Sequence, residues 1–211
     1  MTALSSFRAL ADNAEVASNQ IRAITSWRKA FNRVVLVGEK EPLLDSEHTE
    51  FVDGGDFPRI RTLALIASFE NEMTCLINSD IMVSPSLPRV INEVVSKGGQ
   101  CATSHRYEFN PNTMNLSNAK VVDNGIDFFC ATPNIWKIIV REIPATYRLG
   151  HAAWDTWMMG FFNTTRSRTF YDITKRRCIF HPLHQSRKRV HEIFPVQDKY
   201  CGDCGFPRLK I

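Results

Sequence analysis

The sequence lacks several features that would place it outside ordinary globular proteins. None of its apolar runs approaches the roughly 20 residues of a membrane-spanning helix, so we predict no membrane segment. Its first residues lack the basic flank and long apolar core of a secretory signal, which predicts a soluble, cytoplasmic protein. Repeats, low-complexity tracts and Gly/Ser-rich linkers are also missing, and ordinary globular fractions of hydrophobic and charged residues exclude collagenous, coiled-coil and disordered chains.

Cysteine is present at only six positions, and no export signal accompanies it, so we expect no disulfide framework. Three of the cysteines lie inside apolar stretches, as small core residues do: Cys75, Cys101 and Cys130. The others belong to two pairs with the form of a structural zinc site: Cys178-x-x-His181 and Cys201-x-x-Cys204. One alternative is therefore a zinc-stabilised module that binds nucleic acid through the basic tail.

The composition is that of one sizeable domain. The chain has 211 residues, of which 44% are hydrophobic and 23% charged, and we predict a single domain over residues 1–211 with a basic tail at 190–211. The net charge of +4 is unevenly distributed, because residues 101–211 hold 16 Lys and Arg against 9 Asp and Glu, an excess of +7. This local excess suits phosphate groups of a nucleotide or nucleic acid, and it is equally typical of a solvated surface.

Apolar runs alternate with helical patterns along the chain. In the first half the pattern predicts strands at 2–5, 33–37, 73–77 and 100–104 and helices at 13–29, 60–69 and 88–96. The second half is mixed, with strands at 128–130, 168–173 and 178–180 and helices at 134–141 and 154–162. This order predicts an α/β fold with a mostly parallel central sheet flanked by helices, and ligands beyond the carboxyl ends of its strands.

One acidic residue follows a buried strand directly. The apolar run 73–77 leads into Asn78-Ser79-Asp80, so Asp80 would be held on a rigid element at the mouth of the sheet. A hard divalent cation such as Mg²⁺ or Mn²⁺ takes carboxylate oxygens from protein together with substrate phosphates. The other interpretation is that these three residues only form the turn after the strand.

Two further motifs carry polar groups between apolar neighbours. Asp155 stands between Trp154 and Trp157 near a helix start. It could act as a general base with a raised pKa, or it could be an N-cap or first-turn acid that the helix dipole stabilises. The two tryptophans could belong to the core or offer a face to a sugar ring. His181 and His184 follow a strand, and two imidazoles at this spacing can face one metal or one phosphate.

Taken together in this order, the motifs resemble the GT-A class of nucleotide-sugar glycosyltransferases, and small GT-A-like members in particular. The motifs that carry the resemblance are Asn78-Ser79-Asp80-Ile81, Asn124-Gly125-Ile126-Asp127-Phe128-Phe129, Trp154-Asp155-Thr156-Trp157 and His181-Pro182-Leu183-His184. The resemblance covers roughly residues 1–190. It implies a Rossmann-like GT-A fold and an enzyme that moves a sugar from a nucleoside-diphosphate sugar to a hydroxyl acceptor, with Mn²⁺ or Mg²⁺ as cofactor.

The resemblance also implies roles for individual residues. Asp80 matches the metal-binding Asp of the Asp-x-Asp motif, with His181 or His184 as the late ligand. Asn78 replaces the first Asp of that motif, so it would contact the donor ribose or sugar. The remaining donor residues would be Ser5, Phe7, Glu39, Ser79, Arg106, Asp127, Arg187 and Lys188. Asp155 would be the catalytic base of an inverting enzyme, with Trp154 and Trp157 on the acceptor side.

The acceptor and the class of activity stay open at this point. The positive second half makes DNA with hydroxymethylated pyrimidines one candidate acceptor, since glycosyltransferases of this broad class act on such bases; glycan, lipid-linked sugar and protein acceptors are others. Because the first motif Asp is missing, a catalytically inert nucleotide-sugar-binding protein on the same scaffold is a further alternative. The sequence does not decide the sugar, the nucleotide, the stereochemistry or the oligomeric state.

Overall fold

The fold is a helix–sheet–helix sandwich, described here from a computed structural model that covers residues 1–7, 10, 13–54, 58–149, 154–166, 168–184 and 209–210. The strands are β1 (Thr2–Ser6), β2 (Arg33–Val37), β3 (Thr49–Val52), β4 (Thr74–Ile77), β5 (Met82–Val83), β6 (Cys101–Phe109), β7 (Lys120–Ala131), β8 (Phe170–Asp172), β9 (Ile179–Pro182) and β10 (Leu209–Lys210). The helices are α1 (Ala14–Ala30), α2 (Ile60–Ser68), α3 (Leu87–Ser96), α4 (Pro133–Glu142) and α5 (Trp154–Arg166), with short 3₁₀ turns at Pro42–Leu44, Leu116–Asn118 and Thr174–Arg176.

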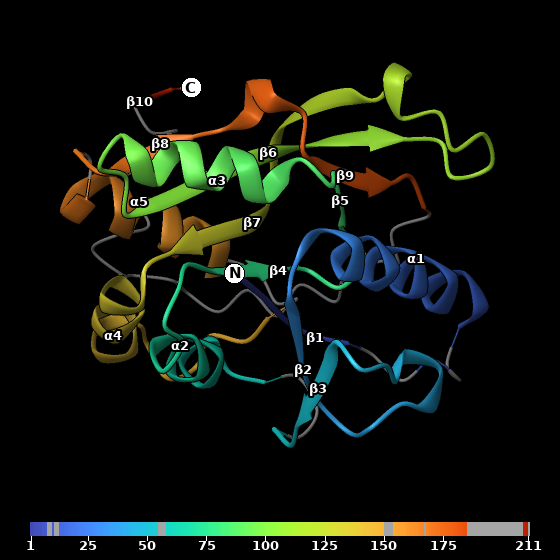
Figure 1. Cartoon of the computed structure of the whole chain (residues 1–211), viewed down its shortest axis with the longest axis horizontal. Helices are drawn as coiled ribbons and strands as arrows, with labels where there is room; N and C mark the ends of the chain where they lie inside the picture. The colour runs from blue at the N-terminus through green and yellow to red at the C-terminus, as the bar shows by residue number, and fades with distance from the viewer. Residues whose placement is uncertain are drawn as a thin grey trace.

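One sheet contains all of these strands (Figure 1). Its order is β10-β8-β6-β7-β4-β1-β2-β3, and β9 lies off this path, paired with β5 and β6. Most neighbouring strands are parallel; the antiparallel pairs are β4 with β7, β6 with β7 and β5 with β9. The predicted α/β class and mostly parallel sheet are therefore confirmed.

Alternation along the central strands divides the core into two layers. In β2, Val35 and Val37 face the layer that contains α2, α4 and α5, whereas Val34 and Leu36 face the layer that contains α1 and α3. Such runs, buried on both faces, are typical of parallel sheets covered by helices. Figure 1 shows α2 and α4 side by side below β4 and β7, where they pack on each other.

The main difference from the sequence expectation lies in β6 and β7. We predicted short strands at 100–104 and 128–130, but both strands extend much further and pair antiparallel, with irregular register near His105. Residues 110–119 form too short a link for a parallel crossover, so the chain must turn back as a hairpin. The short strands β3 and β5 were not predicted either.

The described part of the chain contains no helix with the length and apolar character that crossing a bilayer requires. The predicted tail, 190–211, lies outside the described residues except for β10, which pairs with β8.

We predict that Phe129→Ala destabilises the fold by about 3 to 5 kcal/mol, the usual cost of deleting a buried aromatic ring. Phe129 is fully buried and its ring contacts those of Trp154 and Phe162 at 5.5 and 5.9 Å. Phe69→Ala is the matched control, because Phe69 is 78% exposed and its loss should cost less than about 0.5 kcal/mol. Urea unfolding of both variants measures the difference, and equal losses would contradict the two-layer core.

Candidate metal and donor site

Asp80 is fixed by the turn that follows the central strand β4. The turn is closed by a hydrogen bond from the Ile81 amide to the Asn78 carbonyl at 3.0 Å. The indole of Trp27, on the buried face of α1, donates to the Ile81 carbonyl at 2.7 Å. Both ends of the turn are therefore tied to the core, and Asp80 stands at the carboxyl end of the strand, where the fold places ligands.

Strand β9 brings two imidazoles to the same place. It pairs with β6 so that His181 is the register partner of Glu108, and it pairs with β5, which follows Asp80 in the chain. The Leu183 amide then donates to the Phe109 carbonyl at 2.8 Å, which holds the segment that carries His184. Residues far apart in sequence thus meet because β9 is inserted between β5 and β6.

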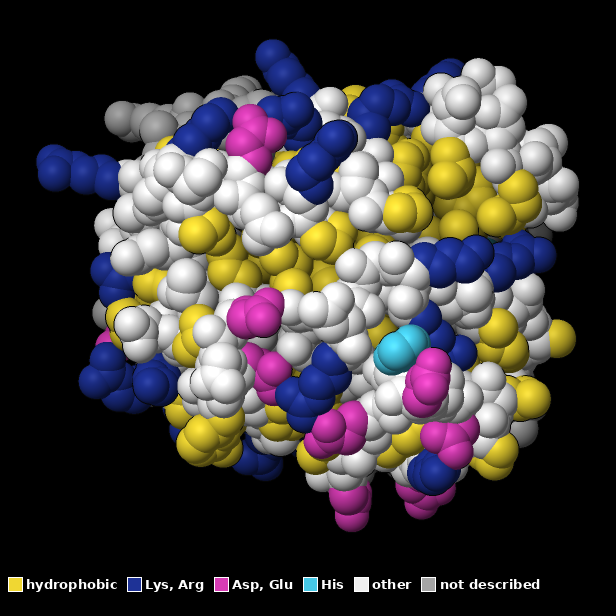
Figure 2. Space-filling model, in the orientation of Figure 1, with side chains coloured by type: hydrophobic (Ala, Val, Ile, Leu, Met, Phe, Trp, Pro, Cys, Tyr) yellow, Lys and Arg dark blue, Asp and Glu magenta, His cyan; other side chains and the backbone are white. Residues whose placement is uncertain are grey.

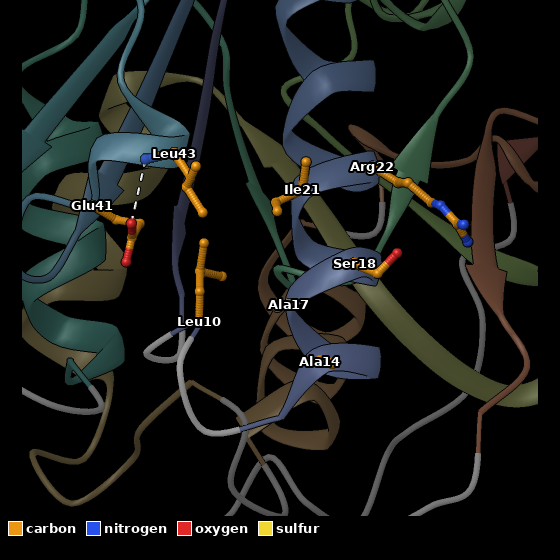
Figure 3. A pocket seen from close by; sticks show the side chains of 8 residues that line it. All are labelled: Leu10, Ala14, Ala17, Ser18, Ile21, Arg22, Glu41 and Leu43. Carbon is orange, nitrogen blue, oxygen red and sulfur yellow. Dashed lines mark hydrogen bonds between the residues drawn. The ribbon is translucent and has the colours of Figure 1, made fainter.

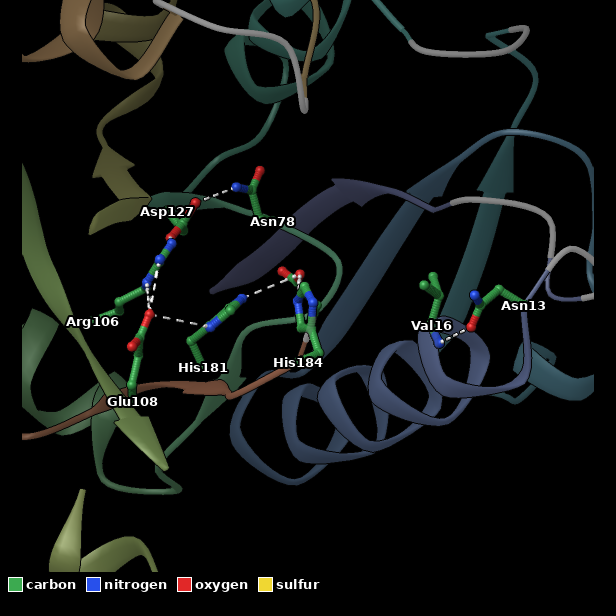
Figure 4. Close-up of polar contacts among 9 residues, drawn as sticks. Asn13, Val16, Asn78, Arg106, Glu108, Asp127, His181 and His184 are labelled. Atoms are coloured by element: carbon green, nitrogen blue, oxygen red, sulfur yellow. Dashed lines mark hydrogen bonds and ion pairs between the residues drawn. The ribbon is translucent and has the colours of Figure 1, made fainter. Parts of the chain in front are cut away.

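The three side chains form a compact group with ligand atoms facing one another (Figure 4). The Nε2 atoms of His181 and His184 each lie 3.4 Å from Asp80 Oδ2, and the three candidate ligand atoms lie within 4.8 Å of one another. Burial disfavours the charged carboxylate, but hydrogen bonds and charge interactions with the two imidazoles hold the pKa of Asp80 well below its usual range. Asp80 is therefore an anion at neutral pH and available to a cation.

The chemistry of this donor set fits a divalent metal ion. One carboxylate oxygen and two imidazole nitrogens suit Mn²⁺ and other transition ions better than Mg²⁺, which prefers oxygen ligands. The Nδ1 atom of His181 is buried and has no hydrogen-bond partner among the described residues. It lies 3.7 Å from Glu108 Oε1, so a neutral imidazole that binds metal through Nε2 would direct its Nδ1–H at this carboxylate.

A chain of charged groups continues from Glu108 away from the metal cluster. Arg106 contacts Glu108 Oε1 at 3.0 Å and Asp127 Oδ2 at 2.5 Å, and Asp127 also accepts a hydrogen bond from the Asn78 amide. Burial alone would lower the pKa of Arg106, but the two carboxylates outweigh it and raise the pKa above its usual value. The array joins β6, β7 and the turn after β4 at one end of the sheet.

Glu108 is a residue that the sequence reasoning missed. Arg106 and Glu108 are two apart on one strand, so they share a face, and this alternation was the available signal. We predicted that the strand ends at residue 104, so the alternation of residues 105–109 along a strand was not apparent.

The other residues predicted to bind the donor lie in different surroundings. Ser5 is fully buried, and its hydroxyl donates to the Ile77 carbonyl at 2.5 Å, so it joins β1 to β4 instead of facing a ligand. Phe7 follows β1 and contacts the Phe51 ring edge-on at 6.0 Å, and Glu39 is exposed after β2. Ser79 is partly buried in the Asp80 turn. Arg187 and Lys188 lie outside the described residues.

The acceptor-side residues are on α5. Trp154 and Trp157 are 3% and 0% exposed, and Trp157 stacks on Phe161 at 5.2 Å, so both indoles are core residues and present no open face to a sugar. Asp155, in the first turn, is partly buried and accepts a hydrogen bond from the Thr156 amide at 2.8 Å. It is not part of the metal cluster, and its role as base stays a prediction.

The described half of the alternative zinc site is not assembled. Cys178 is buried, its thiol faces the Arg176 carbonyl and Ser86, and burial raises its pKa, so it is a protonated core thiol. Its intended partner His181 faces Asp80 instead. Cys201 and Cys204 lie outside the described residues.

The basic cluster Lys175-Arg176-Arg177 is largely engaged within the protein. Arg176 makes two hydrogen bonds of 2.7 Å to the Glu93 carboxylate. Arg177 donates to three backbone carbonyls of the hairpin link and lies 4.3 Å from the Tyr107 ring centre. The predicted surplus of positive charge is therefore partly structural.

A groove of about 690 Å³ lies beside the first turns of α1 (Figure 3). Ala17 and Ile21 of α1 line one side of it, and Leu10 and Leu43 lie opposite, Leu43 in the turn that follows β2. Asn13 caps α1 through hydrogen bonds to the amides of Glu15 and Val16. Its lining residues follow β1 and β2 and belong to α1, and Figure 4 shows the start of α1, at Asn13 and Val16, well to one side of the imidazole pair.

Comparison with solved structures identifies the fold and not the activity. No protein-family model and no curated protein matches the sequence. A Bacillus anthracis protein described as a glucose-1-phosphate thymidylyltransferase, solved with sucrose, is 10% identical, with a TM-score of 0.54 over 87% of this chain and 86% of that one.

Two further solved structures are less similar. Rv0371C of Mycobacterium tuberculosis, solved with manganese, is 12% identical with a TM-score of 0.46 over 66% of this chain and 74% of that one. A 4-diphosphocytidyl-2C-methyl-D-erythritol synthase from Anaerococcus prevotii is 8% identical with a TM-score of 0.45 over 69% and 77%. The chain thus shares the Rossmann-like fold of the thymidylyltransferase structure.

We predict that Glu108→Gln weakens Mn²⁺ binding by about 10- to 100-fold, because a carboxylate that orients a metal-binding imidazole also strengthens it as a ligand. The matched control is Glu47→Gln, which removes a carboxylate 3.4 Å from His48 on the surface. Mn²⁺ titration followed by electron paramagnetic resonance measures both. Equal affinity in wild type and Glu108→Gln would show that Glu108 does not support His181.

Proposed function

We propose that this protein is a divalent-cation-dependent glycosyltransferase that uses a nucleoside-diphosphate sugar as donor. The observation that carries the proposal is the convergence of Asp80, His181 and His184 at the carboxyl end of the central strand. The GT-A resemblance implies a metal at these residues from sequence motifs alone. The fold shared with a solved protein described as a glucose-1-phosphate thymidylyltransferase supports a nucleotide or sugar-phosphate ligand.

The proposed site divides the donor between two regions. The diphosphate would lie at the Asp80 cluster, where a cation held by Asp80, His181 and His184 would stabilise the negative charge that develops as the nucleoside diphosphate leaves. The nucleoside would lie toward the ends of β1 and β2, near Phe7, Glu39 and the groove beside α1. The transferred sugar would meet the Asn78–Asp127–Arg106 array, which offers both donors and acceptors to hydroxyl groups.

The transfer step needs a base for the acceptor. The acceptor oxygen bonds to the anomeric carbon while the bond from that carbon to the diphosphate oxygen breaks and its electron pair leaves with the diphosphate. The hydroxyl proton passes to a carboxylate, and we propose Asp155 for this role. This assignment rests on its motif position at the start of α5.

A second candidate, nucleotidyl transfer, is favoured by the thymidylyltransferase likeness. The two reactions cleave different bonds, so their products separate them. A glycosyltransferase releases the nucleoside diphosphate, whereas a nucleotidyltransferase joins a sugar phosphate to a nucleoside triphosphate and releases pyrophosphate. An inert binding protein, the third alternative, would release neither.

We predict that Asp80→Asn lowers release of nucleoside diphosphate from a nucleotide sugar by at least about 100-fold, the scale of one lost electrostatic group at a reacting centre. Asp123→Asn is the control, since Asp123 is exposed on β7. UDP-glucose, GDP-mannose and similar donors are incubated with Mn²⁺, with or without an acceptor, and chromatography measures the nucleoside diphosphate released by transfer to water or to the acceptor. Normal turnover by Asp80→Asn would remove the cation site from the mechanism. In a parallel assay, metal-dependent release of pyrophosphate from a nucleoside triphosphate and a sugar phosphate would favour the second candidate.

We further predict that Mn²⁺ binds and supports turnover better than Mg²⁺ at equal concentration, by about tenfold or more, because two of the three ligands are imidazoles. Thermal shift with each ion, and with nucleotide sugar added, measures the preference, since a ligand of the native state raises its stability. A preference for Mg²⁺ would mean that the imidazoles do not bind the ion.

A further inference from the structure

A second groove opens at the end of the β6–β7 hairpin, on the opposite side of the imidazole pair from α1. Its volume is about 630 Å³, and its lining includes Asn110, Asn118, Lys120 and Val121 from the hairpin and Leu183 from the segment after β9. The volume lies within the range of about 300 to 1,000 Å³ that is usual for small-molecule sites. Figure 2 shows hydrophobic side chains beside polar groups where the hairpin lies in Figure 1.

Two lining residues connect this groove to the metal cluster. Glu108 lines the groove and also lies 3.7 Å from His181 Nδ1. Leu183 lines the groove and precedes the candidate ligand His184. Figure 4 shows Glu108 on one side of the imidazoles and Asn13 of the α1 cap far on the other. A molecule in the groove would therefore approach the cluster from the side opposite the proposed nucleoside position.

The wall of the groove is held in place by Arg177. Its guanidinium donates to the carbonyls of Leu116, Ser117 and Ala119 and lies against the face of Tyr107. The side-chain oxygens of Asn110 and Asn115 accept hydrogen bonds from the amides two residues later, which closes local turns. The hairpin end is thus preformed, so binding a ligand would not carry the entropic cost of ordering it.

The lining matches a neutral hydroxylated ligand. Asparagine amides both donate and accept hydrogen bonds, as hydroxyl groups do, and Val121 and Leu183, 45% and 51% exposed, offer apolar surface for the C–H face of a sugar ring. The charged lining groups, Lys120 and Glu108, are register partners of opposite sign. A nucleic acid needs several uncompensated cations along its phosphates, and this groove does not supply them.

We infer that this groove binds the acceptor and that the acceptor is a neutral saccharide, whose hydroxyl enters the transfer step described above. That the saccharide is an acceptor rests on the proposed function. Binding of a saccharide to the groove can be measured without any donor or metal.

The test is saturation-transfer NMR of the full chain with maltose, cellobiose and lactose as probes, and with a short DNA duplex as competitor. Val121→Asp should weaken saccharide binding by about tenfold or more, because it places a charge on the apolar face of the site. Val95→Asp is the matched control, since Val95 is 46% exposed on α3, and it should bind as wild type does. Asn118→Ala, which deletes one exposed amide, should also weaken binding.

The outcomes separate the groove from the proposed function. Saccharide binding that survives in Val121→Asp, or no binding by any probe, overturns the inference, as does displacement of saccharide by duplex DNA. If saccharide binds and Val121→Asp loses it, while no nucleotide sugar is turned over, the groove stands and the proposed transferase activity fails. If turnover with water is normal in Val121→Asp but transfer to saccharide is lost, both stand.

Discussion

The pairing of β9 with β6 is the constraint on which the candidate site depends. Without it, Asp80 would be a turn residue after a strand, and the two histidines would belong to an unrelated segment. The pairing places His181 beside Glu108, and the next hydrogen bond, from Leu183 to Phe109, holds the segment that carries His184. A carboxylate and two imidazoles then share one small volume, where the low pKa of Asp80 keeps it charged.

Much of the fold follows from local patterns in the sequence. The run 33–37 and the helical patterns at 60–69, 88–96 and 134–141 match their elements within a residue or so, because apolar periodicity and glycine or proline boundaries act locally. The extent of β6 and β7 did not follow, since residues such as Arg106 and Glu108 face the site instead of the core. Because these residues are polar, the segment lacks the apolar pattern of a strand, and its strand conformation depends on pairing with neighbouring strands.

The site itself was predictable in part. The motif positions of Asp80, His181 and His184 indicated a metal, but three-dimensional pairing was needed to bring them together. The same reasoning placed Ser5 at the nucleotide and the tryptophans at the acceptor, where the structure has a buried hydroxyl bonded to a backbone carbonyl and two core indoles. Polar or aromatic character at a strand end or helix start does not reveal whether a side chain faces the cleft or the core.

The distribution of charge bears on which side of the metal cluster the phosphates and the acceptor would bind. The sequence excess of +7 in residues 101–211 favoured either a polyanionic acceptor or simply the phosphates of the donor. In the structure Arg106 balances two carboxylates, Arg176 is bound to Glu93, and Arg177 braces the hairpin. Arg177 thus holds the end of the hairpin in place, and the two charged residues that line the groove, Lys120 and Glu108, are opposite in sign. A cation held by Asp80 would accommodate negative charge best, so we propose that the phosphates lie there and an uncharged acceptor on the hairpin side.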